Sequence, residues 1–174
     1  QPRTANGILG HDTCAPYKHP VSGTLRVHEI YLSLQGESTF AGLPCVFIRL
    51  TGCDLRCSYC DTAYAFTGGE TLTLDSILEQ TTALAEGYPE PPLVELTGGE
   101  PLLQKETPAL LAALADRGFT VLLETSGAHD ISGVDARVHR IVDLKCPSSG
   151  ESERNLPANL HHLRASDEVK CVIG

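Results

Sequence analysis

Short apolar runs alternate along this chain with segments that have the spacing of amphipathic helices. The runs that predict strands are residues 25–32, 46–50, 93–96, 119–123, 140–144 and 168–173. Helical spacing covers residues 74–85 and a second segment that begins near Thr107, and residues 155–163 suggest a short helix or turn. Alternating strands and helices build right-handed crossover units around a parallel sheet. The pattern therefore predicts an α/β fold.

Capping residues indicate where the two predicted helices begin and end. Thr73 or Asp75 can cap the start of the first helix, and Gly87 favours its end. Thr107 is expected to be the N-cap of the second helix, with Pro108 at its first position.

A polar or glycine-rich motif follows four of the predicted strands. These motifs are a cysteine cluster in residues 52–62, Thr-Gly-Gly-Glu-Pro at 97–101, Glu-Thr-Ser-Gly at 124–127 and Asp-Leu-Lys-Cys-Pro at 143–147. Ligands gather at the carboxyl ends of parallel strands, which all meet at one edge of the sheet. The sequence therefore predicts one functional site, built by all four motifs at that edge.

Size and charge exclude several classes of protein. The 174 residues fit one domain, which we expect to span residues 24–174 after an N-terminal arm, residues 1–23, of unknown role. The chain has 13 basic and 22 acidic residues, a net charge of -9, which is the wrong sign for direct contact with nucleic acid. No apolar run approaches the roughly 18 residues of a membrane helix. The absence of Met, also at position 1, suggests a fragment of a longer reading frame.

Three of the seven cysteines, Cys53, Cys57 and Cys60, form a C-x3-C-x2-C cluster. An odd count without a secretory signal argues against a disulfide framework. Soft thiolate ligands select zinc or iron–sulfur clusters, and three thiolates on a 4Fe–4S cluster would leave one iron open. A structural zinc site needs four ligands. A zinc site completed by Cys146, Cys171 or a histidine therefore remains an alternative.

The isolated cysteines have simpler interpretations. Cys45 and Cys171 lie in strand-like apolar runs, where a free cysteine behaves as a small buried hydrophobe. Cys146 directly follows Lys145, so it is the one isolated cysteine expected close to the site.

Two further residues are unusual where they stand. Arg49 interrupts an apolar strand, and its planar fork suits a substrate carboxylate, although a structural Asp or Glu is the alternative partner. Glu100 follows two glycines that permit close backbone approach to a ligand, and its carboxylate could hold a cationic amine. An ordinary strand-to-helix turn is the alternative, because short glycine motifs are weak signals.

Taken together, the cysteine cluster after one strand and Gly-Gly-Glu-Pro after the next resemble the radical S-adenosylmethionine (SAM) superfamily. The resemblance implies that Cys53, Cys57 and Cys60 carry a 4Fe–4S cluster whose fourth iron is chelated by SAM. One electron then cleaves a carbon–sulfur bond of SAM and releases a 5′-deoxyadenosyl radical. That radical is the reactive group, so no protein side chain is expected to be catalytic.

A closer resemblance covers residues 25–174. Leu32-Ser-Leu-Gln-Gly-Glu37, residues 42–50 and Cys60-Asp-Thr62 are similar, in this order, to the 7-carboxy-7-deazaguanine synthase family, and Ser126 replaces an Asn of its Glu-Thr-Asn-Gly element. The family implies a partial (β/α) barrel with parallel strands, open and trimmed in its helices, and a homodimer. It also implies a carbon–nitrogen lyase that converts 6-carboxy-5,6,7,8-tetrahydropterin to 7-carboxy-7-deazaguanine and ammonia for queuosine biosynthesis.

The same resemblance implies roles for individual residues. The expected substrate contacts are Leu34, Gln35, Gly36, Arg49 and Thr97. The expected SAM contacts are Tyr59, Cys60, Asp61, Gly99, Glu100, Ser126, Asp143, Leu144 and Lys145, and Thr62 is the expected Mg²⁺ ligand. Glu37 and Glu124 are expected as additional contacts.

The family also implies a reductant such as flavodoxin or ferredoxin, and the cluster implies a reducing, cytoplasmic setting. Family chains continue beyond the last predicted strand, so the domain is expected to lack its C-terminal end. Three alternatives remain: a glycyl-radical activase, a non-catalytic zinc module, and a remnant that binds its cluster without catalysis. Gln35, Arg49 and Thr62 favour the pterin enzyme over the activase, which needs no pterin clamp.

Overall fold

The computed structural model describes residues 21–88, 90 and 92–173 of the chain. These residues build one seven-stranded sheet with the order β3-β1-β2-β4-β5-β6-β7. The strands are β1 Thr24–Leu34, β2 Pro44–Leu50, β3 Glu70–Thr73, β4 Leu93–Gly98, β5 Val121–Thr125, β6 His139–Asp143 and β7 Glu168–Lys170. The two α-helices are α1 Leu74–Ala85 and α2 Thr107–Asp116.

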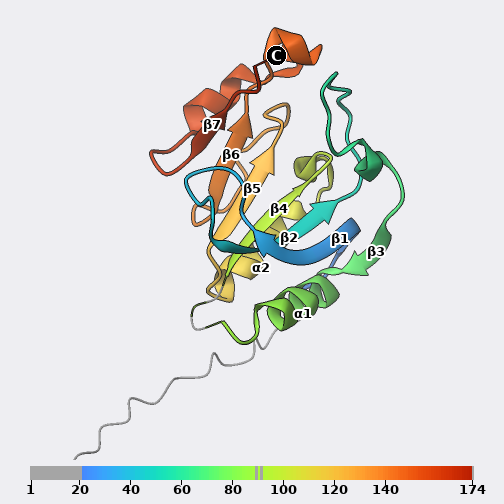
Figure 1. Cartoon of the computed structure of the whole chain (residues 1–174), viewed down its shortest axis with the longest axis vertical. Helices are drawn as coiled ribbons and strands as arrows, with labels where there is room; N and C mark the ends of the chain where they lie inside the picture. Colours follow the sequence, from blue (N-terminus) through green and yellow to red (C-terminus); the bar gives the residue numbers. More distant parts are fainter. Residues whose placement is uncertain (1–20, 89, 91, 174) are drawn as a thin grey trace, which may run out of the picture.

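Most of the sheet is parallel, as predicted. Strands β2, β4, β5, β6 and β7 pair in parallel, whereas β1 is antiparallel to both β2 and β3. The β1–β2 connection is too short for a helical crossover, so those two strands form an antiparallel pair. Strands β3 and β7 are the two edges, so the sheet is an open partial barrel (Figure 1). Strand β3 was not predicted, because its four residues are mostly exposed and lack an apolar pattern.

The two faces of the sheet pack against different parts of the protein. Side chains alternate along a strand, so Val46, Ile48 and Leu50 of β2 face the helices while Phe47 and Arg49 face the other way. Helices α1 and α2 cover the first face and bury the main hydrophobic core with it (Figure 1). In the described part of the chain, the opposite face carries a smaller apolar cluster, which leaves room there for polar side chains.

Helix starts follow the predicted capping in one case and not in the other. The Thr73 hydroxyl accepts a hydrogen bond from the Ser76 amide at 3.1 Å, which confirms Thr73 as the cap of α1. The prediction that Thr107 caps α2 is wrong by one residue, because Glu106 occupies that position. The Thr107 hydroxyl instead donates to the Pro101 carbonyl at 2.6 Å, which ties α2 to the end of β4.

The C-terminal part of the described chain also differs in detail from the predictions. Strand β7 ends at Lys170, so Cys171 lies beyond it and is exposed; the prediction that Cys171 is buried is wrong, whereas Cys45 is buried as predicted. A 3-10 helix at Pro157–His162 matches the predicted short helix. Residues 1–20 of the predicted arm lie outside the described residues. In the part of the chain that the structure describes, no helix is long and apolar enough to span a membrane.

A buried ion pair fastens β6 to the segment before β7. Arg140 and Asp167 are in contact, both with almost fully buried side chains, and Arg164 also pairs with Asp167 at 3.1 Å. Burial alone would raise the pKa of Asp167, but hydrogen bonds from the two guanidinium groups outweigh it and lower that pKa to about 2. This cluster fixes the position of the segment that carries Lys170.

Candidate active site

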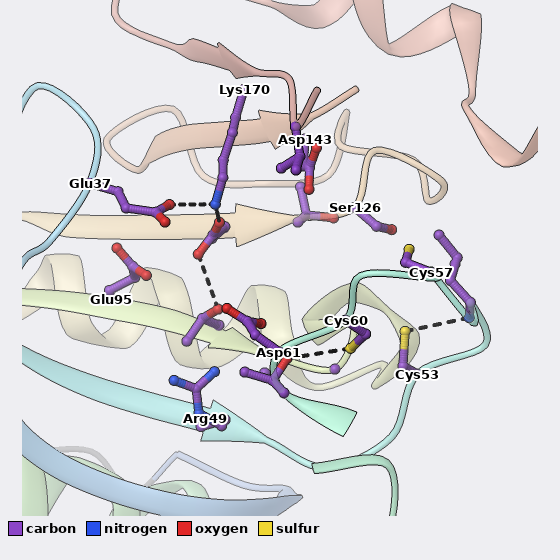
Figure 2. Close-up of a pocket in the computed structure, with 18 of the residues that line it drawn as sticks. Glu37, Arg49, Cys53, Cys57, Cys60, Asp61, Glu95, Ser126, Asp143 and Lys170 are labelled. Atoms are coloured by element: carbon purple, nitrogen blue, oxygen red, sulfur yellow. Dashed lines mark hydrogen bonds and ion pairs between the residues drawn. The ribbon is translucent and has the colours of Figure 1, made fainter. Parts of the chain in front are cut away.

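The carboxyl edge of the parallel strands opens into a cavity of about 480 Å³. Its wall combines the β1–β2 connection, the cysteine-bearing loop after β2, and residues at or near the ends of β4, β5, β6 and β7. All four motifs that follow predicted strands contribute to this wall. Figure 2 shows the three clustered cysteines at one end of the pocket and Arg49 and Glu95 toward the other.

The cysteine loop is held against the β6–β7 connection. The Ser58 amide donates to the Ser149 carbonyl at 2.9 Å, and its hydroxyl donates to the Ser148 carbonyl at 2.6 Å. The Arg56 amide donates to the Glu151 carboxylate at 2.6 Å. These bonds orient the loop without using any cysteine side chain as an anchor.

The three clustered cysteines are available to a metal cofactor. Cys53, Cys57 and Cys60 are free, partly exposed, and line the cavity together, and burial raises the pKa of the Cys53 and Cys57 thiols. Among the described residues, no three His, Cys, Asp or Glu side chains lie close enough to ligate one metal ion. The zinc alternative that the sequence analysis left open therefore gains no support from this part of the chain.

Two glycines let the end of β4 approach the start of the cysteine loop. Gly98 has φ +148°, and a Cβ there would lie 2.3 Å from the Leu50 carbonyl oxygen. A Cβ on Gly99 would lie 2.1 Å from the Gly52 carbonyl oxygen. The Glu100 amide donates to that same Gly52 carbonyl at 2.8 Å. Only glycine fits at these two positions, which makes a cradle of bare backbone beside Cys53.

Glu100 is buried directly behind the cavity wall. Its carboxylate is fully buried and accepts hydrogen bonds from the Leu102 amide at 2.8 Å, the Thr125 hydroxyl at 2.8 Å and the Ser126 amide at 2.7 Å. Glu100 is not among the residues that line the cavity, although Gly99 and Ser126 are. The carboxylate therefore joins the ends of β4 and β5 through Thr125 and Ser126, two residues that line the cavity.

The end of β6 offers a charged pair with an open acceptor. Asp143 Oδ2 accepts from Lys145 Nζ at 2.5 Å, while the buried Asp143 Oδ1 has no hydrogen-bond partner among the described residues. Burial lowers the pKa of Lys145, but the Asp143 carboxylate outweighs this and raises it above the usual value for lysine. Both side chains line the cavity, whereas Leu144 is exposed and does not. An unpartnered buried oxygen is a fit for a donor group of a bound cofactor such as SAM.

Other expected cofactor residues also lie on the wall. Tyr59, Asp61, Thr62 and Ser126 all line the cavity. The Thr62 hydroxyl lies 3.9 Å from the Cys60 sulfur, so a hydroxyl ligand is available beside the cysteine loop.

Arg49 faces the cavity and also has a structural partner. Its Nε donates to Glu29 at 2.8 Å, and its Nη2 donates to the Tyr31 hydroxyl at 3.1 Å. The partner that the sequence analysis left open is therefore present. Arg49 also lines the cavity, so Glu29 and Tyr31 hold its guanidinium in place at the cavity wall. Thr97, on the neighbouring strand, lies on the same wall.

Gln35 is fixed by the protein on both ends of its side chain. Its Nε2 donates to the Glu95 carboxylate, and its Oε1 accepts from the Glu37 amide at 3.0 Å. Gln35 and Gly36 line the cavity, but Leu34 is 63% exposed and does not.

Sequence reasoning missed two charged residues of this pocket, Glu95 and Lys170. Glu95 is only 3% exposed on β4, and Lys170 of β7 forms ion pairs with Glu37 and, at 2.7 Å, with Glu124. Burial and the neighbouring Glu124 raise the pKa of Glu95 to about 8. A signal for Glu95 existed, because buried parallel strands are nearly continuous apolar runs and a carboxylate interrupts this one. Lys170 gave no such signal.

Comparison with known proteins defines the class. The family model described as "Radical SAM superfamily" matches residues 47–148, a stretch that begins in β2 and ends just after the Asp143–Lys145 pair. The open parallel sheet and the three-cysteine pocket are thus those of a radical SAM protein.

Proteins named 7-carboxy-7-deazaguanine synthase are similar over most of the chain. The one from Koribacter versatilis is 47% identical over 150 residues, which are 86% of this chain and 65% of that protein. The one from Chlorobaculum tepidum is 52% identical over 135 residues, 78% of this chain and 59% of that protein. The one from Thermoplasma acidophilum is 38% identical and matches 84% of this chain and 69% of its own length.

A crystal structure of QueE from Escherichia coli superposes with a TM-score of 0.71 at 25% identity, over 87% of this chain and 72% of that one. The chain belongs to the 7-carboxy-7-deazaguanine synthase family of the radical SAM superfamily. It spans less than two thirds of the Koribacter and Chlorobaculum proteins.

Proposed function

We propose that this protein is a carbon–nitrogen lyase that converts 6-carboxy-5,6,7,8-tetrahydropterin to 7-carboxy-7-deazaguanine and ammonia, a step toward queuosine. One observation carries this proposal: a single cavity is lined by the three cysteines, the glycine cradle and the Arg49–Thr97 wall. Its volume of about 480 Å³ lies within the usual range of small-molecule sites.

The cofactor assignments follow from the donor groups on the wall. Cys53, Cys57 and Cys60 would hold a 4Fe–4S cluster, which together with SAM supplies the 5′-deoxyadenosyl radical that removes a hydrogen from the substrate. The bare backbone at Gly99 and the open acceptor of Asp143 would bind SAM. Tyr59, Asp61, Ser126 and Lys145 line the same part of the wall and complete this set. Leu144 and Glu100 would support it from outside the cavity.

A magnesium ion would complete the cofactor set. Thr62 would supply its protein ligand, since Mg²⁺ keeps most of its shell as waters and substrate oxygens.

The substrate assignments use the opposite wall. Arg49 would bind the substrate carboxylate through its guanidinium fork, which Glu29 and Tyr31 hold in place. Thr97, Gly36 and the backbone at residues 34–36 would contact the pterin ring, and Gln35 would orient the chain there.

The partners follow from the same chemistry. We infer an external one-electron reductant such as flavodoxin or ferredoxin, and a reducing, cytoplasmic compartment that keeps the thiols free. A homodimer is proposed from the family alone. Direct contact with nucleic acid is not expected at a net charge of -9.

The test is an anaerobic assay of the reconstituted chain with SAM, Mg²⁺, dithionite and 6-carboxytetrahydropterin. The expected result is 7-carboxy-7-deazaguanine by mass spectrometry, lost in Cys57→Ser and kept in Cys146→Ser, a matched control outside the cluster motif. Formation of 5′-deoxyadenosine without this product would overturn the substrate assignment. No SAM cleavage by iron-loaded protein would overturn the radical chemistry.

A further inference from the structure

The connection between β1 and β2, residues 35–43, is a compact loop that we call the strap. Two hydrogen bonds close its base: the Gln35 amide donates to the Leu43 carbonyl at 2.9 Å, and the Gly42 amide donates to the Gln35 carbonyl at 2.7 Å. A loop whose ends are close and bonded to each other holds its own shape. The strap can therefore move as a unit relative to the sheet.

The strap extends toward β6 and β7, which β4 and β5 separate from β2 in the sheet (Figure 1). The Phe40 ring packs edge-on against His139 of β6, with ring centroids 5.2 Å apart. Figure 2 shows Lys170 of β7 reaching Glu37 of the strap, with which it forms an ion pair. A second cavity, of about 220 Å³, is lined jointly by the strap and by these strands.

Glu168 of β7 ties the middle of the strap to the sheet. Its Oε1 accepts hydrogen bonds from the Thr39 hydroxyl at 2.6 Å and from the Thr39 amide at 3.1 Å, and its Oε2 lies 3.2 Å from the same amide. Among the described residues, every hydrogen bond to the Glu168 carboxylate comes from Thr39. Hydrogen bonds to a charged acceptor are stronger than those between neutral groups, so this contact is a latch for the strap.

The latch stands on a fixed anchor. Glu168 directly follows Asp167, whose buried ion pair with Arg140 fastens this segment to β6. Glu168 and Lys170 are two positions apart on β7, so their side chains share one face of the strand, and both line the second cavity. Lys170 also lines the main cavity, whereas Glu168 does not. Glu168 can therefore affect the main cavity only through the strap.

We propose that Glu168 is a positioning residue for substrate binding, because it holds the strap closed through Thr39. The closed strap places Gln35 and Gly36 on the wall of the main cavity. This inference rests on the proposed function, in which that part of the strap contacts the pterin ring. Glu168 itself would touch neither the pterin nor SAM. The proposed SAM contacts lie on the segments that follow β2, β4, β5 and β6, so loss of the latch should leave SAM binding unchanged.

The size of the effect follows from the population of the closed strap. When only a fraction of the molecules is competent to bind, the apparent affinity falls by that fraction. If loss of the latch leaves the strap closed in about one molecule in ten, the Kd for the pterin rises about tenfold. The contacts of Gln35 with Glu95 and of Phe40 with His139 remain, so the strap should not unfold.

The experiment measures equilibrium binding of SAM, and then of 6-carboxytetrahydropterin with SAM present, to the anaerobically reconstituted chain without reductant. The proteins are wild type, Glu168→Ala, Thr39→Val and the double variant. Thr39→Val removes the hydroxyl and keeps the amide, so it tests the contact with little change to the fold. Glu153→Ala is the matched control, because Glu153 is an exposed acid that lines neither of the two cavities. Melting temperatures of all five proteins verify folding.

The expected result is a pterin Kd about tenfold higher in Glu168→Ala and a smaller rise in Thr39→Val. The double variant should match Glu168→Ala, because residues that act through one contact are not additive. The Kd for SAM should stay at the wild-type value in every variant, and Glu153→Ala should bind both ligands as wild type does. Amide hydrogen exchange of the strap should be faster in Glu168→Ala than in wild type.

Three outcomes would contradict the account. A Glu168→Ala protein that binds the pterin as tightly as wild type would overturn the inference and leave the proposed function intact. Equal loss of SAM and pterin binding in that variant would show a merely structural role and would also overturn the inference. Wild-type protein that binds SAM but not the pterin would overturn the proposed function, and the inference with it.

Discussion

Replacing Glu100 by Gln tests whether this residue is a buried connection between strands. Each carboxylate oxygen accepts from a backbone amide, Oε1 from Leu102 and Oε2 from Ser126. In Gln, one of these positions becomes an NH2 group. Whichever way the amide turns, its NH2 faces a backbone N–H that cannot become an acceptor.

The cost follows from that conflict. One charge-assisted bond is lost, about 1.5–3 kcal/mol, and one buried N–H is left unsatisfied, about 1–3 kcal/mol. These two costs add to about 2.5–6 kcal/mol. Relaxation of the surroundings recovers part of that sum, so the free energy of unfolding should fall by about 2–5 kcal/mol. For a chain of this size that corresponds to a melting temperature lower by roughly 4–20 °C.

Thermal and urea unfolding of Glu100→Gln against wild type measure this loss. Glu95→Gln, on the strand β4 that precedes Glu100, is the matched control, because the donor to Glu95 is the Gln35 side chain and its neighbour Glu124 can accept from the new amide. We expect that control to stay within about 1 kcal/mol of wild type. Equal stability of Glu100→Gln and wild type would refute the role of Glu100 as a buried connection between strands. It would favour the alternative role of Glu100 as a ligand of the cofactor amine.

Three further outcomes follow from the fold and the site. Asp167→Asn should lower the free energy of unfolding by about 3–5 kcal/mol, because it leaves the buried Arg140 charge without its partner; a loss below about 1 kcal/mol in urea unfolding would contradict this. The pKa of Asp167 is lowered to about 2, so its carboxylate contributes fully to the free energy of unfolding above about pH 4. Roughly 2 kcal/mol of that free energy should be lost as the pH falls from about 4 toward about 2. An acid-unfolding curve of wild type that matches the curve of Asp167→Asn would refute this prediction. Gly99→Ala should retain less iron and sulfide than wild type after reconstitution, because its Cβ would displace Gly52 and Cys53; full cluster content would show that the close approach is not required.

The edge of the sheet where the site lies could be predicted because parallel strands put their carboxyl ends together. Alternation of apolar and polar residues also set which face the helices cover, as Val46 and Ile48 illustrate. The short edge strand β3 gave no pattern to detect, and the end of β7 could not be placed from an apolar run that continues through Cys171.

Side-chain roles were harder to predict than positions. Glu100 lies in a motif that the family resemblance links to the cofactor, yet its carboxylate accepts a hydrogen bond from Ser126. The spacing of residues in a sequence does not predict the rotamer of a side chain. Gln35 was expected to face the ligand, and its bond to Glu95 depends on a contact between residues 60 positions apart. Lys170 lies in the pocket because β7 pairs with β6. The sequence could suggest this last strand, but it could not predict which residues of the two strands lie opposite each other.

The central claim is that Cys53, Cys57 and Cys60 alone hold a 4Fe–4S cluster with one iron open to SAM. The most direct measurement is iron and sulfide content after anaerobic reconstitution, together with the electron paramagnetic resonance spectrum of the reduced protein with and without SAM. The account predicts about four irons and four sulfides per chain and a spectrum that changes on SAM addition, in wild type and in Cys146→Ser alike. Bound zinc, or loss of the metal in Cys146→Ser, would contradict it.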